Sequence, residues 1–408
     1  MHQSGRSPVS ANHLEIIDLL RGVAILAVFL FHCLGASFGF SQLPWNGLFP
    51  GLKVSATFFA LLPCSYGWAG VALFFVISGF CIHLSHIRSG EKGFGRFFVR
   101  RFFRIYPAYL VCVLAFFFIP PWNSIAGWSL GGAAQLASHL LLLQNISSRS
   151  LFGINPSFWS IAVEVQLYVL YPVLLAMISR LGWKRTLLIL TVLELSLRSF
   201  GAAYQISTGQ SSPIWVSLNG FPLAFWMSWS LGAYLAEMYM IGEKMPFAEQ
   251  PLWLWTAIAF GTQLFRPTAA FTFPAFCFLS AIFISKALNN AEATAAQATR
   301  PWSRTLRFVG VVSYSFYLIH QPLVLLVASL ANRLNVSTWL NTWKLFLLCL
   351  ALFPIIAFLS WSMYELLEKR SISVGKSVLA LMPRRLQANQ HQQLNEGIST
   401  LAGDTEHS

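Results

Sequence analysis

Charge is the property that this sequence has least of. Only 10% of its 408 residues are Asp, Glu, Lys or Arg, whereas about 25% is usual in a soluble domain. This deficit excludes an ordinary cytosolic enzyme and a disordered protein. Acidic residues are the scarcer kind, with 14 against 27 Lys and Arg, which leaves a net charge of +13. Because 56% of the chain is hydrophobic, this excess predicts basic cytoplasmic loops of a membrane protein, and we expect no nucleic-acid partner.

Several common site motifs are missing as well. The six cysteines form no CxxC pair, which predicts packed, reduced thiols rather than a disulfide framework. No cluster of His, Asp, Glu or Cys has the spacing of metal ligands, so we expect no metal. The sequence also contains no P-loop and no GxSxG elbow. None of these common routes to catalysis is therefore indicated.

Long apolar runs dominate what is present. A run of about 18 apolar residues marks a membrane helix, and we count ten segments: 14–36, 66–87, 99–119, 157–180, 185–203, 220–241, 251–265, 270–288, 308–331 and 343–365. The sequence thus predicts an all-α, polytopic membrane helical bundle over residues 1–370. Residues 371–408 are predicted to form a cytoplasmic tail that is largely disordered.

The distribution of Lys and Arg predicts the orientation. Ten spans place both termini on one side of the membrane. If that side is the cytoplasm, 21 of the 27 basic residues fall in cytoplasmic segments and 6 fall outside, as the positive-inside rule requires. Residues 37–65 and 120–156 are then long outer loops, and the second of them contains Trp122 and Trp128. Residues 289–303 become a cytoplasmic linker.

Polar residues within the first span are the strongest candidates for chemistry, because a charge at the bilayer centre costs at least about 2.5–3.5 kcal/mol. Asp18 and Arg21 are three residues apart and can form an ion pair. His32 follows Arg21 by 11 residues and shares its face of the helix, about 16 Å further on. A neutral imidazole there can act as a general base. A packed histidine bonded to a neighbouring helix is an equally acceptable interpretation.

Two further segments carry polar residues on one helix face. Ser78 and Gly79 lie in the middle of the second span, where glycine permits the close approach of a helix or a ligand, helix packing being the simpler explanation. Arg101 and Arg104 belong to a cluster of arginines that suits phosphate groups. An ordinary cytoplasmic flank is the alternative, although it explains Arg104 less well because an apolar run follows at once.

Two later spans carry similar stripes. Glu164 and Tyr168 are four residues apart, and the carboxyl group must either be neutral or have a cationic partner, for which Arg101 and Arg104 are candidates. Tyr317 lies near the middle of the ninth span, with His320 beside it. The alternatives are a structural ion pair for the first stripe and interfacial anchoring for the second.

These stretches, in this order, resemble the acyltransferase 3 family of integral-membrane O-acyltransferases. The motifs are IDLLRGVAILAVFLFH, FFVISGF, RRFFRIYP, FWSIAVEVQLYVLYP and SYSFYLIHQPL. Two departures stand out. Leu19 occupies a position where the family usually has glycine, and Lys369-Arg370 lacks the proline that usually follows the glutamate corresponding to Glu368.

The resemblance implies transfer of an acyl group, most often acetyl, from acyl-coenzyme A to a hydroxyl of a cell-surface saccharide or a lipid-linked glycan. It also implies an integral protein of the bacterial inner membrane that contacts membrane lipid. The sequence leaves the oligomeric state open. The implied catalytic group is His32 as the base, with Asp18 and Glu164. The residues expected to bind the donor, acetyl-coenzyme A, are Arg21, Arg101, Arg104 and Ser78, and those expected to contact the acceptor are Tyr168, Tyr317 and His320. Trp122 and Trp128 of the second outer loop are candidates to stack on a sugar.

A proton-coupled exporter of saccharides or small molecules is the alternative function. An intramembrane histidine with acidic residues suits such a carrier. Against it, the sequence shows no internal repeat of the kind that many carriers have. A non-catalytic membrane partner is favoured least, because titratable residues recur at aligned helix positions.

Overall fold

The computed structural model describes residues 11–40, 43, 62–90, 93–119, 122, 131–208, 220–242, 244–290, 300–334 and 341–383. The predicted tail after residue 383, Trp128, and most of the predicted linker and of the first outer loop lie outside these residues. Within the described ranges every regular element is a helix. The prediction of an all-α, polytopic membrane protein is therefore confirmed.

The first half of the chain contains these helices: α1 (Ala11–Phe38), α3 (Leu62–Ser65), α4 (Ala69–Ser89), α5 (Gly95–Phe118), α7 (Gly132–Leu140), η2 (Gln144–Ile146) and α8 (Phe158–Thr208). The second half contains η3 (Pro222–Phe225), α10 (Trp226–Ile241), α11 (Leu252–Thr262), α12 (Arg266–Ala269), α13 (Thr272–Asn289), α15 (Pro301–Val311), α16 (Ser313–Arg333), α17 (Thr342–Ala351), α18 (Phe353–Met363), η5 (Tyr364–Glu368) and α19 (Lys369–Leu381).

Seven helical stretches of the described chain are long and apolar enough to cross a membrane. Two of them hold more than one helix. The 51-residue α8 breaks at Gly182, where φ is 74°, a left-handed conformation that glycine adopts without strain. This break separates the fourth and fifth predicted spans. The stretch from Thr342 to Leu381 contains α17, α18, η5 and α19. Each of the ten predicted segments overlaps one or more helices, but α10 and α11, with 16 and 11 residues, are not among the seven membrane-length stretches.

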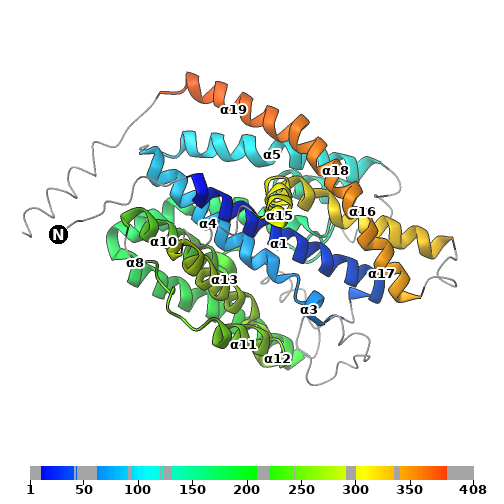
Figure 1. Cartoon of the computed structure of the whole chain (residues 1–408), viewed down its shortest axis with the longest axis horizontal. Coiled ribbons are helices and arrows are strands. Elements are labelled where there is room, and N and C mark those ends of the chain that lie inside the picture. Colours follow the sequence, from blue (N-terminus) through cyan, green and yellow to red (C-terminus); the bar gives the residue numbers. More distant parts are fainter. Residues whose placement is uncertain are drawn as a thin grey trace, which may run out of the picture.

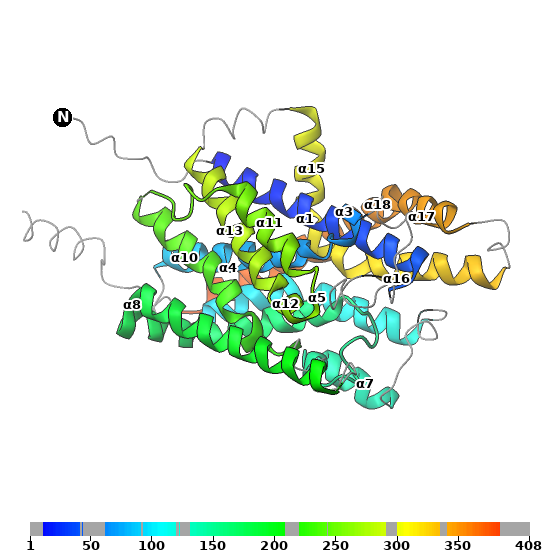
Figure 2. The same cartoon turned by 90° about the horizontal axis from the view of Figure 1, so that it is seen from below.

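Helices α1 and α4 form the centre of the bundle (Figure 1). α1 packs against α4, α15, α16 and α17, and α4 packs against α10 and α13. α5 and α19 lie side by side along one edge. In the view from below, the long α8 and the short α7 cover the face opposite α15 (Figure 2). Residues of α1, α4, α5, α8 and α16 can therefore meet in the interior.

Glycines fix the contact between α4 and α10. A Cβ atom on Gly79 would lie 2.0 Å from the carbonyl oxygen of Trp229, and one on Gly232 would lie 1.9 Å from that of Val76. Both distances are far below van der Waals contact, so the two helix backbones touch directly. Gly79 therefore serves helix packing, the simpler of the two explanations that the sequence offered for it.

The helix after residue 370 belongs to the folded bundle. α19 packs along α5, with Gly375 against Phe103. The guanidinium group of Arg96 donates to the carbonyl oxygens of Leu379 (2.5 Å) and Met382 (2.9 Å), which satisfies the open end of the helix. The first residues of the predicted disordered tail thus form a helix as far as Leu381, because tertiary contacts and this cap support it.

We predict that Gly79→Ala and Gly232→Ala each lower the thermal stability of the detergent-solubilised protein. The added methyl group must push α4 and α10 apart, and overpacking typically costs about 1–3 kcal/mol. Gly261→Ala is the control, since nothing lies within 4 Å of a Cβ there. Fluorescence-detected gel filtration after heating measures the effect. Equal melting temperatures for all three variants would contradict this account of the interface.

Candidate functional site

Two cavities follow one another along α1. The first, the arginine cavity, has a volume of about 470 Å³ and is lined by Asp18, Arg21, Arg101 and Arg104 together with residues of α4, α8 and α16. The second, the aromatic cavity, has a volume of about 610 Å³ and is lined by His32 and mainly by aromatic side chains. Arg21 and His32 thus share one face of α1, as their spacing predicted, but each contributes to a different cavity.

The arginine cavity carries an excess of positive charge. Asp18 pairs with Arg21 at 3.7 Å, which confirms the predicted ion pair. Arg101 is partly buried, lies 5.9 Å from the ring centroid of Phe97, and donates weakly to Ser85 at 3.4 Å. Its Nε atom is buried without a hydrogen-bond partner in the described structure. With Arg104 on the same wall, the cavity has the electrostatics of an anion site.

Glu164 lies in the same cavity with a different set of partners from those expected. Its Oε1 atom accepts hydrogen bonds from Ser78 Oγ and from Tyr168 OH, both at 2.5 Å. Trp229 Nε1 in turn donates to Ser78 Oγ at 3.2 Å. No ion pair to an arginine is found for Glu164 among the described residues, so the expected cationic partner is replaced by two hydroxyl groups. Tyr168, predicted to contact the acceptor, therefore lines the arginine cavity.

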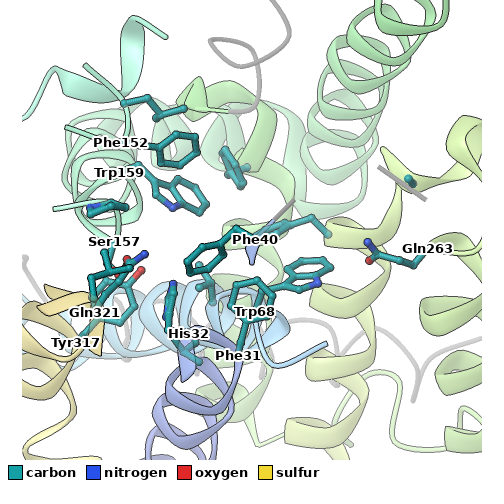
Figure 3. A pocket seen from close by; sticks show the side chains of 18 of the residues that line it. Phe31, His32, Phe40, Trp68, Phe152, Ser157, Trp159, Gln263, Tyr317 and Gln321 are labelled. Atoms are coloured by element: carbon teal, nitrogen blue, oxygen red, sulfur yellow. The ribbon is translucent and has the colours of Figure 1, made fainter. Parts of the chain in front are cut away.

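Aromatic rings form most of the second cavity (Figure 3). Its lining includes Phe31, Phe40, Trp68, Phe152, Trp159, Phe225 and Phe273. The few polar groups include Gln263 and a pair in which Ser157 Oγ donates to Gln321 Oε1. Flat rings with a few hydrogen-bonding groups suit a ligand that presents both C–H faces and hydroxyl groups.

Of the two tryptophans suggested by the sequence, Trp128 lies outside the described residues and only Trp122 can be placed. Trp122 packs against Phe116 and does not line the cavity, whereas Trp68 and Trp159 do. Trp159 was visible in its motif, but its role was not assigned. Trp68 lay inside the predicted span 66–87 but was given no role, and Phe152 lies in a loop where no periodic pattern marks a face.

Arg198 is a further lining residue that sequence reasoning missed. It pairs with the fully buried Glu194 at 3.3 Å, and Glu194 also accepts from Ser228 N (3.0 Å) and Oγ (2.6 Å). The guanidinium carbon lies 5.0 Å from the ring centroid of Phe225 and 5.3 Å from that of Phe273. The neutralised arginine therefore holds two aromatic walls of the cavity in place. The signal was a Glu–Arg pair four residues apart in an apolar segment.

Glu237 has a structural partner as well. His83 is buried, with Nε2 2.6 Å from Glu237 Oε2 and Nδ1 2.8 Å from Tyr171 OH. Neither cavity includes these three residues in its lining. They tie α4, α8 and α10 together outside the candidate site.

The two cavities meet at one wall. Val71 and Tyr317 line both of them. The hydroxyl group of Tyr317 lies 2.6 Å from Ser160 Oγ, and Ser160 lines the arginine cavity. Tyr317, a predicted acceptor contact, is thus the side chain that separates an anion-attracting space from an aromatic one.

His32 projects from α1 into the aromatic cavity, near Tyr317 and Gln321 (Figure 3). Its Nδ1 atom lies 2.9 Å from Nε2 of His320 on α16. His320 is fully buried and lines neither cavity, so the structure places it behind His32 rather than against an acceptor. Within the described residues, no group of three His, Cys, Asp or Glu side chains is arranged to hold a metal ion.

A family model described as an acyltransferase domain matches residues 14–361. The chain is 27% identical over 385 residues to nodulation protein 10 of Rhizobium leguminosarum bv. viciae, which covers 87% of this chain and 93% of that protein. It is 24% identical over 402 residues to the peptidoglycan O-acetyltransferase OatA of Listeria monocytogenes, covering 87% of this chain and 56% of that protein. No solved structure matches the chain.

Proposed function

Because this chain belongs to the acyltransferase 3 family and is a membrane O-acyltransferase, we propose that it moves an acetyl group from acetyl-coenzyme A to a saccharide hydroxyl. The observation that carries the proposal is the wall at Val71 and Tyr317, shared by an arginine-lined and an aromatic cavity. Family membership favours this enzyme over the saccharide exporter. The name of the Listeria relative, a peptidoglycan O-acetyltransferase, supports acetyl as the group and a glycan as the acceptor.

We assign the arginine cavity to the cytoplasmic face and the aromatic cavity to the outer face of the bacterial inner membrane. Cytoplasmic termini and ten spans satisfy the positive-inside rule, and they place Asp18 near the inner end of α1 and His32 near its outer end. Acetyl-coenzyme A is made in the cytoplasm, and its phosphates carry the negative charge that the arginine cavity attracts. A glycan or lipid-linked saccharide reaches the aromatic cavity from the other side.

In the donor site, Arg21, Arg101 and Arg104 bind the phosphate groups of acetyl-coenzyme A. Planar guanidinium groups suit this task because they donate two parallel hydrogen bonds to a phosphate. Ser78, Glu164 and Tyr168 line the path between these arginines and the wall. Their mutual hydrogen bonds keep Glu164 from pairing with Arg101 and Arg104, whose charge then remains available for the donor.

In the reaction, His32 removes the proton from the acceptor hydroxyl. The oxygen of that hydroxyl attacks the thioester carbonyl across the wall formed by Val71 and Tyr317. The tetrahedral intermediate collapses with cleavage of the carbon–sulfur bond. The thiolate of coenzyme A leaves and receives the proton that His32 had taken, so that an ester and free coenzyme A result. We assign to the Tyr317 hydroxyl the role of hydrogen-bond donor to the developing oxyanion.

Mass spectrometry of surface glycans tests the function as a whole. Cells with the intact gene are expected to carry glycans heavier by about 42 Da per acetyl group, roughly one C₂H₂O unit. Cells without the gene lack this increment, and a plasmid copy restores it. Identical glycan and glycolipid masses with and without the gene would contradict the proposal.

His32→Gln should lower kcat by about 10²–10⁴-fold, the usual contribution of a general base. The KM for acetyl-coenzyme A should change little, because His32 does not line the arginine cavity. Release of the free thiol of coenzyme A by the purified protein in lipid nanodiscs measures both constants. His86→Gln is the control, a histidine of α4 that lines neither cavity. A His32→Gln variant with wild-type turnover would remove His32 from the mechanism.

Arg101→Ala and Arg104→Ala should each weaken coenzyme A binding by about 10- to 100-fold, since a hydrogen bond to a charged group contributes about 1.5–3 kcal/mol. Isothermal titration with coenzyme A measures the dissociation constant, and the effect should shrink at high salt. Arg100→Ala is a matched control, because Arg100 lies on the same helix but does not line the cavity. Equal affinities for the three variants would place the donor elsewhere.

A further inference from the structure

A second histidine stands directly behind the proposed base. His320 Nε2 lies 2.9 Å from His32 Nδ1, and the two ring centroids are 4.9 Å apart. His320 is completely buried, and it reaches neither cavity. A residue in that position cannot touch the acceptor or the donor, so any influence on the reaction has to pass through His32.

The backbone of α16 decides which nitrogen of His320 carries the proton. Nδ1 lies 2.9 Å from the carbonyl oxygen of Tyr317 and 3.1 Å from that of Phe316. A carbonyl oxygen only accepts hydrogen bonds, so Nδ1 must donate. The ring is neutral, because no carboxylate in the described structure bonds to either histidine and burying an unpaired charge is costly. Nε2 of His320 therefore carries a lone pair.

The His32 ring contacts that lone pair and also hydrogen-bonds to the backbone carbonyl of Val28, and both of these partners are acceptors. The contact between the two rings needs one donor and one acceptor. Since Nε2 of His320 accepts, Nδ1 of His32 must donate, and its proton is fixed there. A neutral His32 then carries its basic lone pair on Nε2, on the edge of the ring that faces the aromatic cavity.

We propose that His320 is a positioning residue that holds His32 in the tautomer with its basic nitrogen toward the acceptor. This rests on the proposed function, in which His32 is the base. His320 also accepts a hydrogen bond from the His32 imidazolium that forms when the acceptor proton is taken. It thus performs the orienting role of the third residue in a catalytic triad. A neutral acceptor does this without burying a carboxylate in the bundle.

Two substitutions of similar polarity separate this role from simple packing. His320→Gln places an amide oxygen close to the former Nε2 position and keeps an acceptor for His32. In His320→Asn the shorter side chain reaches only the former Nδ1 position. It can donate to the backbone carbonyls, but it provides no hydrogen-bond acceptor for His32. We expect His320→Asn to lower kcat by about 10²-fold or more with an unchanged KM for acetyl-coenzyme A. His320→Gln should recover at least ten-fold of that loss.

The tautomer itself is measured by ¹⁵N nuclear magnetic resonance of histidine-labelled protein, which needs neither substrate nor activity. The His32 signals, assigned as those missing in His32→Gln, should show a protonated Nδ1 and an unprotonated Nε2 in the wild type. In His320→Asn this pattern should be lost. A wild-type His32 protonated on Nε2, or equal turnover of the Asn and Gln variants, overturns the proposal. A wild type with the expected tautomer but no acyl transfer overturns the proposed function instead.

Discussion

Every polar group inside a membrane bundle needs a partner from the protein itself, and this constraint organises the interior of this one. The hydrocarbon core of the membrane contains no water that could bond to a buried donor or acceptor. A polar group without a hydrogen bond there costs several kcal/mol. Glu194 therefore has Arg198 and Ser228, and Glu164 has two hydroxyl groups. Some buried donors of the described residues, among them the Nε atom of Arg101 on the arginine cavity, have no partner in the structure.

The helices and the faces of single helices were predictable from the sequence, because both follow from periodicity within one segment. The 11-residue spacing of Arg21 and His32 placed them on one face of α1, and the arginines of α5 reached the same interior. Contacts between helices were not predictable in this way. His32 and His320 are 288 positions apart, and no pattern within either segment says which rings meet. The prediction of an arginine partner for Glu164 was wrong for the same reason, because the proximity of Glu164 to Ser78 depends on how α4 packs on α8.

The second span shows that a packing role and a functional role can occupy adjacent positions. Gly79 lets the backbones of α4 and α10 touch, and Trp229 of α10 then reaches across to Ser78. Ser78 is thereby held against Glu164 on the wall of the arginine cavity. Close helix contact is in this case the means by which a polar side chain is aimed. A contact from a distant part of the chain also supports the helix after residue 370, because Arg96 of α5 caps its C-terminal end.

The wall at Val71 and Tyr317 also has an electrical consequence. Where two cavities approach from opposite faces, the insulating layer is thin and the membrane voltage falls mainly across it. In the proposed reaction the proton lost by the acceptor ends on the thiol of coenzyme A and crosses inward, while the acetyl group, formally an acylium unit, crosses outward. The two formal charges cancel, because a neutral hydroxyl and a thioester become a neutral ester and a thiol. The overall transfer is therefore an electroneutral exchange, and the membrane voltage does not shift its equilibrium, in contrast to a current carried by an ion.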